Sequence, residues 1–193
     1  MKYKQLHDEL YLIEEALSYK DFVAVEDEFY YEKWDFSKRG NGEENCEEYP
    51  VRGELQKPYS QSNLSTLGDN LQFIKIGTES KYKCERILRT RLTFLRIHTN
   101  IQFFGQESSF HRDIDNPPNN LKFWGLLYFV QSKWNSEWGG DFVYNVDEEY
   151  INVPYIPGNA VLFNTQNQHK GMAPNVLCRD ARLSLQYLFM QNL

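Results

Sequence analysis

The chain lacks long apolar stretches and is poor in cysteine. None of its apolar runs approaches the roughly 18 residues that a membrane-spanning helix needs, and its first residues, MKYKQLHDEL, lack the apolar stretch of a secretory signal. The three cysteines, Cys46, Cys84 and Cys178, are odd in number and widely spaced, which fits neither a disulfide framework nor a zinc pattern. These absences favour free buried thiols in a reducing compartment, so we expect a cytoplasmic protein that does not contact a membrane.

Positive charge is also in deficit. Lysine and arginine number 21 against 27 aspartates and glutamates, for a net charge of −6. Surfaces that hold a phosphate backbone are basic, so nucleic acid is disfavoured as a partner. Basic residues do cluster between Lys75 and Arg96. A solvated helix face is the favoured interpretation of this cluster, and an anion-binding patch is the alternative.

The length of 193 residues fits one domain spanning 1–193. Apolar residues at helical spacing predict a helix in KQLHDELYLIEEALSY, residues 4–19. The β-branched and aromatic residues of DFVAVEDEFYYEKWDF, residues 21–36, predict extended structure, and ESKYKCERILRTRL, residues 79–92, predicts a further helix. Between them, residues 37–63 are polar and rich in Gly, Glu, Asn, Pro and Ser, which predicts a long loop and a candidate lid.

The second half of the chain predicts a succession of short strands. The apolar runs are LTFLRIHTNIQFF, LKFWGLLYFV, GDFVYNV, YINVPYI, NAVLFN and RLSLQYLFM, and turn signals such as DNPPNN, NSEWGG and IPGN separate them. Short strands with this punctuation indicate an antiparallel sandwich or barrel. We therefore expect a mainly β core over residues 93–190, supported by helical and irregular structure in residues 1–92.

Two of these strands have one polar face each. In LRIHTNIQ the polar side chains are Arg96, His98, Asn100 and Gln102, and in RLSLQYLF they are Arg182, Ser184 and Gln186. Side chains alternate across a strand, so each set shares one face. These faces either meet water, as in a half-exposed antiparallel sheet, or line the inside of a barrel around a polar ligand.

A candidate metal site comes from three residues in two segments. His111 and Asp113 lie in SFHRDIDNPPNN, and His169 follows the apolar strand AVLF. Two imidazoles and one carboxylate leave three adjacent positions of an octahedral metal open, which is the arrangement of non-haem Fe(II) oxygenases.

The order of motifs around these residues is more specific than the three residues alone. His111-x-Asp113 is followed by Gly139-Gly140-Asp141-Phe142, then by Pro157-Gly158, His169 and Arg182-Leu183-Ser184. This order resembles the Fe(II)/2-oxoglutarate dioxygenase superfamily, and most of all its small prolyl-4-hydroxylase-like branch. The resemblance covers about half of the chain, from Thr93 to Met190, and implies a double-stranded β-helix, or jelly roll.

The resemblance also implies roles for particular residues. His111, Asp113 and His169 would bind Fe(II). Arg182 would pair with the distal carboxylate of 2-oxoglutarate, since a guanidinium matches a carboxylate bidentately, and Ser184 lies on the same face. Asn100 and Gln102 fall where relatives place a cosubstrate contact. Arg179 is a rival to Arg182, because the gap from His169 to Arg182 is longer than in many relatives.

The implied reaction is hydroxylation of an unactivated C–H bond with 2-oxoglutarate as cosubstrate and dioxygen as oxidant, and ascorbate is a candidate reductant. The carboxylate of Asp113 favours hydroxylation over halogenation. The alternatives are a non-redox, cupin-like module that binds a metal or ligand, and a zinc hydrolase with the same three ligands.

The substrate is a prolyl or other peptidyl residue by analogy, and a small molecule is the alternative; the sequence does not indicate an oligomeric state. Trp138, beside Gly139 and Gly140, could line a substrate cleft or pack in the core. His98 shares the face of Asn100 and could line the site or play a structural role.

Overall fold

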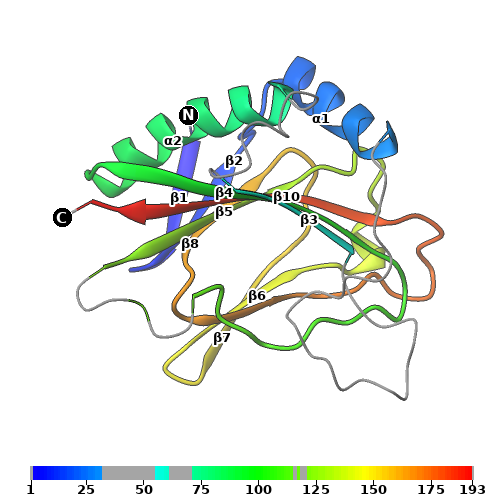
Figure 1. Cartoon of the computed structure of the whole chain (residues 1–193). Coiled ribbons are helices and arrows are strands. Elements are labelled where there is room, and N and C mark those ends of the chain that lie inside the picture. The colour runs from blue at the N-terminus through cyan, green and yellow to red at the C-terminus, as the bar shows by residue number, and fades with distance from the viewer. Residues whose placement is uncertain (1, 32–54, 61–70, 115–116, 118–120, 193) are drawn as a thin grey trace.

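The computed structural model describes residues 2–31, 55–60, 71–114, 117 and 121–192. Two antiparallel β-sheets face each other, and two helices cover the outer face of the larger sheet (Figure 1). This mainly β architecture, a jelly-roll core with supporting helices from the N-terminal half, confirms the predicted fold class.

Among the described residues, seven strands make up the larger sheet and three the smaller one. In spatial order the larger sheet holds β1 (Lys2–His7), β2 (Leu10–Glu14), β8 (Ala160–Asn164), β5 (Phe123–Phe129), β10 (Arg182–Gln191), β4 (Leu92–Gln102) and β3 (Leu55–Ser60). The smaller sheet holds β7 (Glu149–Val153), β6 (Phe142–Val146) and β9 (Gln168–Gly171). The helices are α1 (Tyr19–Tyr31) and α2 (Leu71–Leu88), and η3 (Ser136–Trp138) is a short 3-10 turn. The six strands expected in the second half are all present.

The two predictions for the N-terminal segments are wrong. Residues 4–19, predicted as a helix, contain the antiparallel pair β1 and β2, and residues 21–36, predicted as extended, begin with most of α1. In α1 the apolar side chains Phe22, Val25 and Phe29 are all buried, at three- and four-residue intervals that place them on one helical face. Strand β2 is fixed instead by its pairing with β8, which no local pattern encodes.

The candidate lid, residues 37–63, falls mostly outside the described residues. Within it, residues 55–60 form β3, which pairs with β4 at the edge of the larger sheet. Part of the segment predicted as a loop is therefore a strand, supported by backbone hydrogen bonds to its neighbour.

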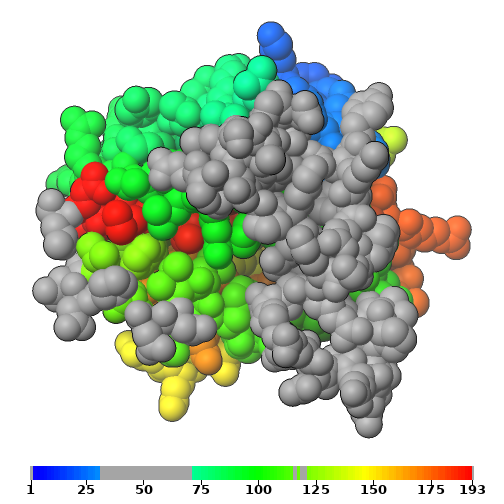
Figure 2. Space-filling model, in the orientation of Figure 1, coloured from blue at the N-terminus to red at the C-terminus, as the bar shows by residue number. Residues whose placement is uncertain are grey.

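The helices pack on the outer face of the larger sheet. A hydrophobic core lies between the helices and this face of the sheet. It contains the outward side chains of β10 (Leu183, Leu185, Tyr187 and Phe189) and apolar residues of α1 and α2, among them Val25, Phe29, Phe73 and Ile76. In the space-filling view α1 and α2 lie along the upper edge of the molecule (Figure 2). Neither helix in the described part of the chain is long and apolar enough to cross a membrane.

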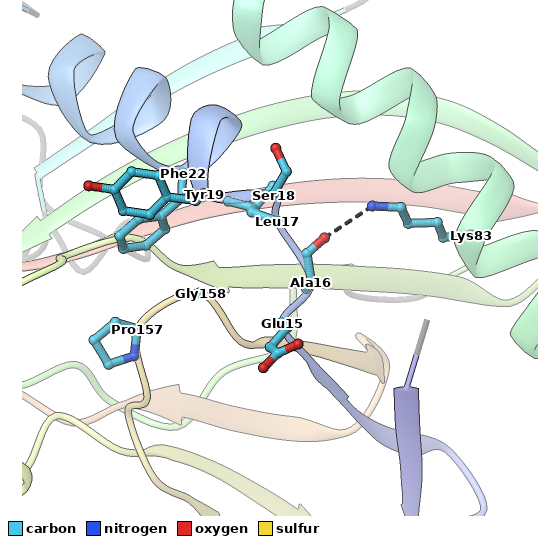
Figure 3. A pocket seen from close by; sticks show the side chains of 9 residues that line it. All are labelled: Glu15, Ala16, Leu17, Ser18, Tyr19, Phe22, Lys83, Pro157 and Gly158. Atoms are coloured by element: carbon cyan, nitrogen blue, oxygen red, sulfur yellow. Dashed lines mark hydrogen bonds between the residues drawn. The ribbon is translucent and has the colours of Figure 1, made fainter.

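A cavity of about 700 Å³ lies where α1, α2 and the turn before β8 meet (Figure 3). Lys83 on α2 donates a hydrogen bond to the Ala16 carbonyl, at 3.0 Å, and the Ala16 amide donates to the Gly158 carbonyl, at 2.8 Å. These bonds tie the start of the helical layer to the sheets, and the cavity shares no residue with the polar faces of β4 and β10.

A second core lies between the two sheets. It is formed by Leu10, Leu127, Phe129, Phe142, Tyr144, Val153, Tyr155, Val161 and Phe163. These side chains fill one half of the space between the sheets, and the polar faces of β4 and β10 border the other half. The interior is therefore apolar on one side and polar on the other.

The basic cluster between Lys75 and Arg96 divides between two environments. On α2, Lys75 pairs with Asp21 and Lys81 with Glu85, as expected of a solvated helix face. Arg96, by contrast, lies on the inner face of β4 and its guanidinium is 3.7 Å from the Asp113 carboxylate.

Candidate metal and cosubstrate site

The polar faces of β4 and β10 line the interior of the fold. The two strands are antiparallel neighbours in which Arg182 lies opposite Gln102, Ser184 opposite Asn100 and Gln186 opposite His98. All six residues are buried, with no more than 9% of their surface exposed. Of the two alternatives left open by the alternating pattern, the faces that meet water are excluded, and both polar faces line the interior.

His111 and His169 lie opposite each other across an antiparallel bridge. Each backbone amide donates to the other residue's carbonyl, at 3.1 and 3.0 Å, and the two imidazole rings are 4.5 Å apart at their centroids. His169 lies on β9, a strand that the sequence analysis did not name, and His111 lies in the segment between β4 and β5. The bridge therefore fixes two imidazoles side by side.

Asp113 completes the group. Its amide donates to the Thr165 carbonyl at 3.2 Å, and its Oδ1 lies 3.7 Å from Nε2 of both His111 and His169. The three ligand atoms are within 4.8 Å of one another. Ligand atoms around one metal ion lie roughly 3 to 4 Å apart, so a small movement of these side chains would bring all three onto a single ion.

Hydrogen bonds orient both imidazoles toward Asp113. Nδ1 of His111 is 3.0 Å from the Ser109 carbonyl, and Nδ1 of His169 is 3.0 Å from the Asn167 carbonyl. A carbonyl can only accept, so each Nδ1 carries a proton, which makes Nε2 the nitrogen that can offer a lone pair to a metal. Backbone carbonyls commonly fix metal-binding histidines in this tautomer.

The Asp113 carboxyl is held in its ionised form. Burial alone would raise its pKa, but the neighbouring His169, His111 and Arg96 outweigh burial and hold the pKa well below its usual range. Gln186 on β10 donates from Nε2 to Oδ2 of Asp113 at 2.7 Å. Oδ2 is thus engaged by an amide, while Oδ1 faces the two imidazoles.

Arg182 is buried on the same polar wall, with 1% of its surface exposed. Its Nε donates to the Gly140 carbonyl at 2.7 Å, and its Nη1 donates to Oε1 of Gln102 at 2.9 Å and to the Ser184 hydroxyl at 3.3 Å. The guanidinium also lies over the Tyr155 ring, 5.3 Å from its centroid. A Cβ at Gly171 would lie 3.1 to 3.2 Å from the guanidinium atoms, so the small residue leaves room for it.

Gln102 and Asn100, which are also expected to contact the cosubstrate, differ in whether their side-chain polar atoms have hydrogen-bond partners within the protein. Gln102 is occupied within the protein, since its Nε2 donates to the carbonyls of Gln106 and Gly171 while Oε1 accepts from Arg182. Asn100 is 5% exposed, and its Oδ1 is buried without a hydrogen-bond partner among the described residues. Buried polar atoms usually have partners, so this oxygen favours a ligand in the interior.

Of the remaining candidates, Arg179 and Trp138 lie away from this wall, and His98 is part of it. Arg179 is exposed, in the loop between β9 and β10 that projects at the side of the molecule (Figure 2). Trp138 is half-buried and packs edge-on against Trp134. His98 is buried beside the triad, and burial together with Arg96 lowers its pKa to about 4, so it is neutral at pH 7.

Three contacts of the site are not predicted by the sequence. Gln186 and Arg96 fall on predicted polar faces, but the sequence does not connect either with Asp113 and gives no role to Tyr155. The contacts of Gln186 and Arg96 with Asp113 depend on the strand register. Gln186 lies opposite His98, and Arg96 lies one inward-facing position further along β4. No sequence signal connects Tyr155 with Arg182.

The donor set fits a divalent first-row metal. It offers two imidazole nitrogens and one carboxylate oxygen, and no thiolate, which suits Fe(II) and leaves coordination positions open. Beside it lie a buried guanidinium and an unpartnered amide oxygen, groups able to receive a carboxylate.

No family model matches the sequence, and no curated protein matches it. Many solved structures share the fold. The prolyl-4-hydroxylase of Pseudomonas putida has a TM-score of 0.67 at 13% identity, over 95% of this chain and 93% of that chain. A Trichoplax adhaerens prolyl hydroxylase, solved with a peptide fragment of hypoxia inducible factor, has a TM-score of 0.67 at 14% identity, and the match covers 94% of this chain and 83% of that chain. The carbocyclase SnoK of nogalamycin biosynthesis has a TM-score of 0.68 at 13% identity, over 94% and 79%.

A further similar structure, from Burkholderia pseudomallei, is an oxidoreductase of the 2OG-Fe(II) oxygenase family, and SnoK is described as non-haem and α-ketoglutarate dependent. At identities of 12 to 14% the likeness is one of fold. It shows that the chain has the fold on which these enzymes are built. The chemistry of this chain has to be argued from its own site.

Proposed function

We propose that the protein is a dioxygenase that depends on Fe(II) and 2-oxoglutarate and hydroxylates an unactivated C–H bond. The observation that carries the proposal is the position of Arg182, buried on the inner wall that also holds Gln186, the hydrogen-bond partner of Asp113. A metal-binding module without redox chemistry, or a zinc hydrolase, needs the three ligands but has no use for a buried guanidinium aimed at the same interior.

In this proposal the side chains divide the work. His111, Asp113 and His169 hold the metal, with Nδ1 of each imidazole fixed by a backbone carbonyl and Asp113 fixed by Gln186. Arg182 and Ser184 receive the distal carboxylate of the cosubstrate, and Asn100 offers its unpartnered amide on the facing strand. When bound, the metal with 2-oxoglutarate and dioxygen supplies the oxidising power.

The protein also keeps this chemistry away from water. The core residues Phe142 and Phe163 pack beside the His169 ring, at centroid distances of 5.8 and 4.6 Å. Excluding water strengthens the charge interactions in a site and limits side reactions. The apolar half of the interior thus shields one side of the proposed metal.

Two substrate classes are compatible with the proposed reaction. The fold neighbours include prolyl hydroxylases, one solved with a peptide fragment, and the epimerase SnoN and carbocyclase SnoK of nogalamycin biosynthesis. A prolyl or other peptidyl residue and a small molecule therefore both remain as substrates of the proposed reaction.

The test is anaerobic reconstitution with Fe(II) and 2-oxoglutarate. We expect a weak visible metal-to-ligand charge-transfer band, and in air we expect succinate formation that depends on 2-oxoglutarate. The variant His169→Ala should lose the band, because one of three ligands is gone. A wild-type protein that binds the metal but gives neither band nor succinate would favour the hydrolase or the binding module, and an undiminished band in the variant would remove His169 from the site.

A further inference from the structure

A second arginine faces the proposed metal site. Arg96 lies on the inner face of β4, and its Nη2 is 3.7 Å from Oδ1 of Asp113. Its side chain is 30% exposed, so the guanidinium lies between the buried triad and the solvent. No other acidic side chain of the described residues forms an ion pair with it.

The donors of Arg96 are not committed to Asp113. The distance of 3.7 Å exceeds that of a hydrogen bond. The Nε atom of Arg96 is buried and has no hydrogen-bond partner among the described residues. A buried donor that lacks a partner is costly. The unpartnered Nε therefore favours an additional hydrogen-bond acceptor beside the Arg96 guanidinium.

The strand register separates Arg96 from the cosubstrate subsite. Along the β4–β10 ladder, the inward pairs run from Gln102–Arg182 through Asn100–Ser184 to His98–Gln186, and Gln186 holds Asp113. Arg96, opposite Leu188, is the next inward position beyond this point. Successive inward positions on a strand lie roughly 7 Å apart. A cosubstrate held between the metal and Arg182 would therefore leave Arg96 on the far side of the metal.

The sum of the charges at the proposed site also favours an additional anion beside Arg96. A divalent metal, the Asp113 carboxylate, a dianionic cosubstrate and Arg182 together carry no net charge. Arg96 is then left as one uncompensated cation, because Lys170, a neighbouring cation on β9, is paired with Glu107. One positive charge suits a monoanion better than a phosphate dianion.

We propose that the substrate of this site carries a carboxylate and that Arg96 binds it. The inference rests on the proposed function and adds to it a substrate class. A guanidinium fork matches a carboxylate in shape as well as in charge. The carboxylate belongs either to a free acid, such as an amino acid, or to an Asp or Glu side chain of a peptide.

The competing role for Arg96 is purely structural. In that role the guanidinium serves only to balance Asp113, and its removal would weaken metal binding without changing which organic molecules bind. The experiment must therefore measure selectivity for a carboxylate on protein that is already loaded with metal and 2-oxoglutarate.

The probes are matched pairs that differ in charge alone. One arm uses the common amino acids as free α-carboxylates and as α-carboxamides. The other arm uses blocked peptides that contain Asp or Glu, against the same peptides with Asn or Gln. Each probe is titrated anaerobically into the protein with Fe(II) and 2-oxoglutarate, and the shift of the charge-transfer band reports binding; succinate formation in air is the second measurement.

We expect the wild-type protein to respond to carboxylates in one arm and much less to their neutral partners. Arg96→Gln should weaken binding of the responding carboxylate about tenfold or more, the scale of one charged hydrogen bond, and Arg96→Lys should restore part of it. Arg86→Gln removes an equal charge from an exposed position on α2 and should bind the probes like the wild type.

Each other outcome is decisive. Equal responses to charged and neutral probes, no response to any carboxylate, or an Arg96→Gln variant that discriminates like the wild type would each overturn the carboxylate assignment. The absence of the band before any probe is added would instead contradict the proposed function itself. The two failures are therefore distinguishable.

Discussion

Arg182 is the most deeply buried charged side chain among the described residues, at 1% exposure. Its burial is matched by hydrogen bonds to Gly140, Gln102 and Ser184 and by the Tyr155 ring. Keeping a guanidinium in such a position costs solvation free energy. The protein bears this cost at the inner end of the polar wall, which supports a role in receiving an anion.

If the proposed function holds, replacing Arg182 should separate cosubstrate binding from metal binding. Arg182→Ala should weaken 2-oxoglutarate binding by roughly tenfold to a hundredfold, the scale of a charged hydrogen bond, while the metal still binds at the triad. Titration of 2-oxoglutarate against the anaerobic Fe(II) protein measures this loss. Arg179→Ala is the matched control, and a loss confined to that variant would show that the exposed arginine holds the cosubstrate.

Gln186 is expected to position Asp113 without touching the reacting groups. Its amide donates to Oδ2 at 2.7 Å. Gln186→Leu keeps the size and removes the donor, and outer partners of metal ligands typically contribute about 10- to 100-fold to metal affinity. We expect a loss of that order in Co(II) or Fe(II) affinity, measured by competition with a chelator. Gln131→Leu, on the loop after β5, is the control, and equal affinities in the two variants would remove this role from Gln186.

The sequence predicts the members of the proposed site, but it does not predict most of their contacts. His111, Asp113, His169 and Arg182 could be named because motif order constrains them, and the structure groups the first three and buries Arg182 in the interior between the two sheets. The bond from Gln186 to Asp113 joins residues 73 positions apart, so it depends on how β10 is aligned with its neighbours. Tyr155 reaches Arg182 from outside the polar strands, and only the packing of the two sheets reveals it.

At the scale of helices and strands, local sequence patterns predict the strands of the second half correctly. The strands of the second half are bounded by turns and carry alternating or continuous apolar runs, which local sequence encodes. Residues 4–19 show apolar residues at helical spacing, yet β2 is held by β8, more than 140 residues away in the chain. Pairing with a distant strand can override local preference, and nothing in the segment itself signals that partner.

The seating of α2 on the sheet gives a test at this scale. A Cβ at Gly77 would lie 2.6 Å from the ring of Tyr187 and 2.9 Å from that of Phe94, and the Tyr187 hydroxyl is anchored to the Phe73 carbonyl at 2.8 Å. Ala normally favours a helix over Gly by about 1 kcal/mol, but overpacking costs roughly 1–3 kcal/mol.

We therefore expect Gly77→Ala to lower the free energy of unfolding by up to about 2 kcal/mol, measured by urea denaturation. Glu79→Ala, exposed on the same helix, is the control and should change it by less than about 0.5 kcal/mol. A more stable Gly77→Ala protein would show that α2 does not sit against Tyr187 as described.

At the scale of the whole molecule, the proposed site lies across the two sheets. His169 belongs to β9 of the smaller sheet, Arg182 to β10 of the larger one, and His111 and Asp113 to the segment between β4 and β5. In the absence of a ligand these elements are joined by the apolar core between the sheets and by a few hydrogen bonds, such as that from Arg182 to Gly140. A metal and a cosubstrate bound here would add links between both sheets.

This arrangement predicts a stepwise gain in stability on ligand binding. A ligand present at a hundred times its dissociation constant stabilises the folded state by about 2.7 kcal/mol, which for a chain of this size raises the Tm by roughly 5–10 °C. We expect anaerobic Fe(II) to give one increment and 2-oxoglutarate a second that requires the metal, both measured by thermal unfolding. Arg182→Ala should retain the first increment and lose most of the second, because the triad stays intact while the distal carboxylate loses its partner. His169→Ala should lose both, since without the metal the cosubstrate keeps only one of its two attachments. If 2-oxoglutarate stabilised His169→Ala as much as the wild type, the cosubstrate would bind independently of the triad, and the two subsites would not form one site between the sheets.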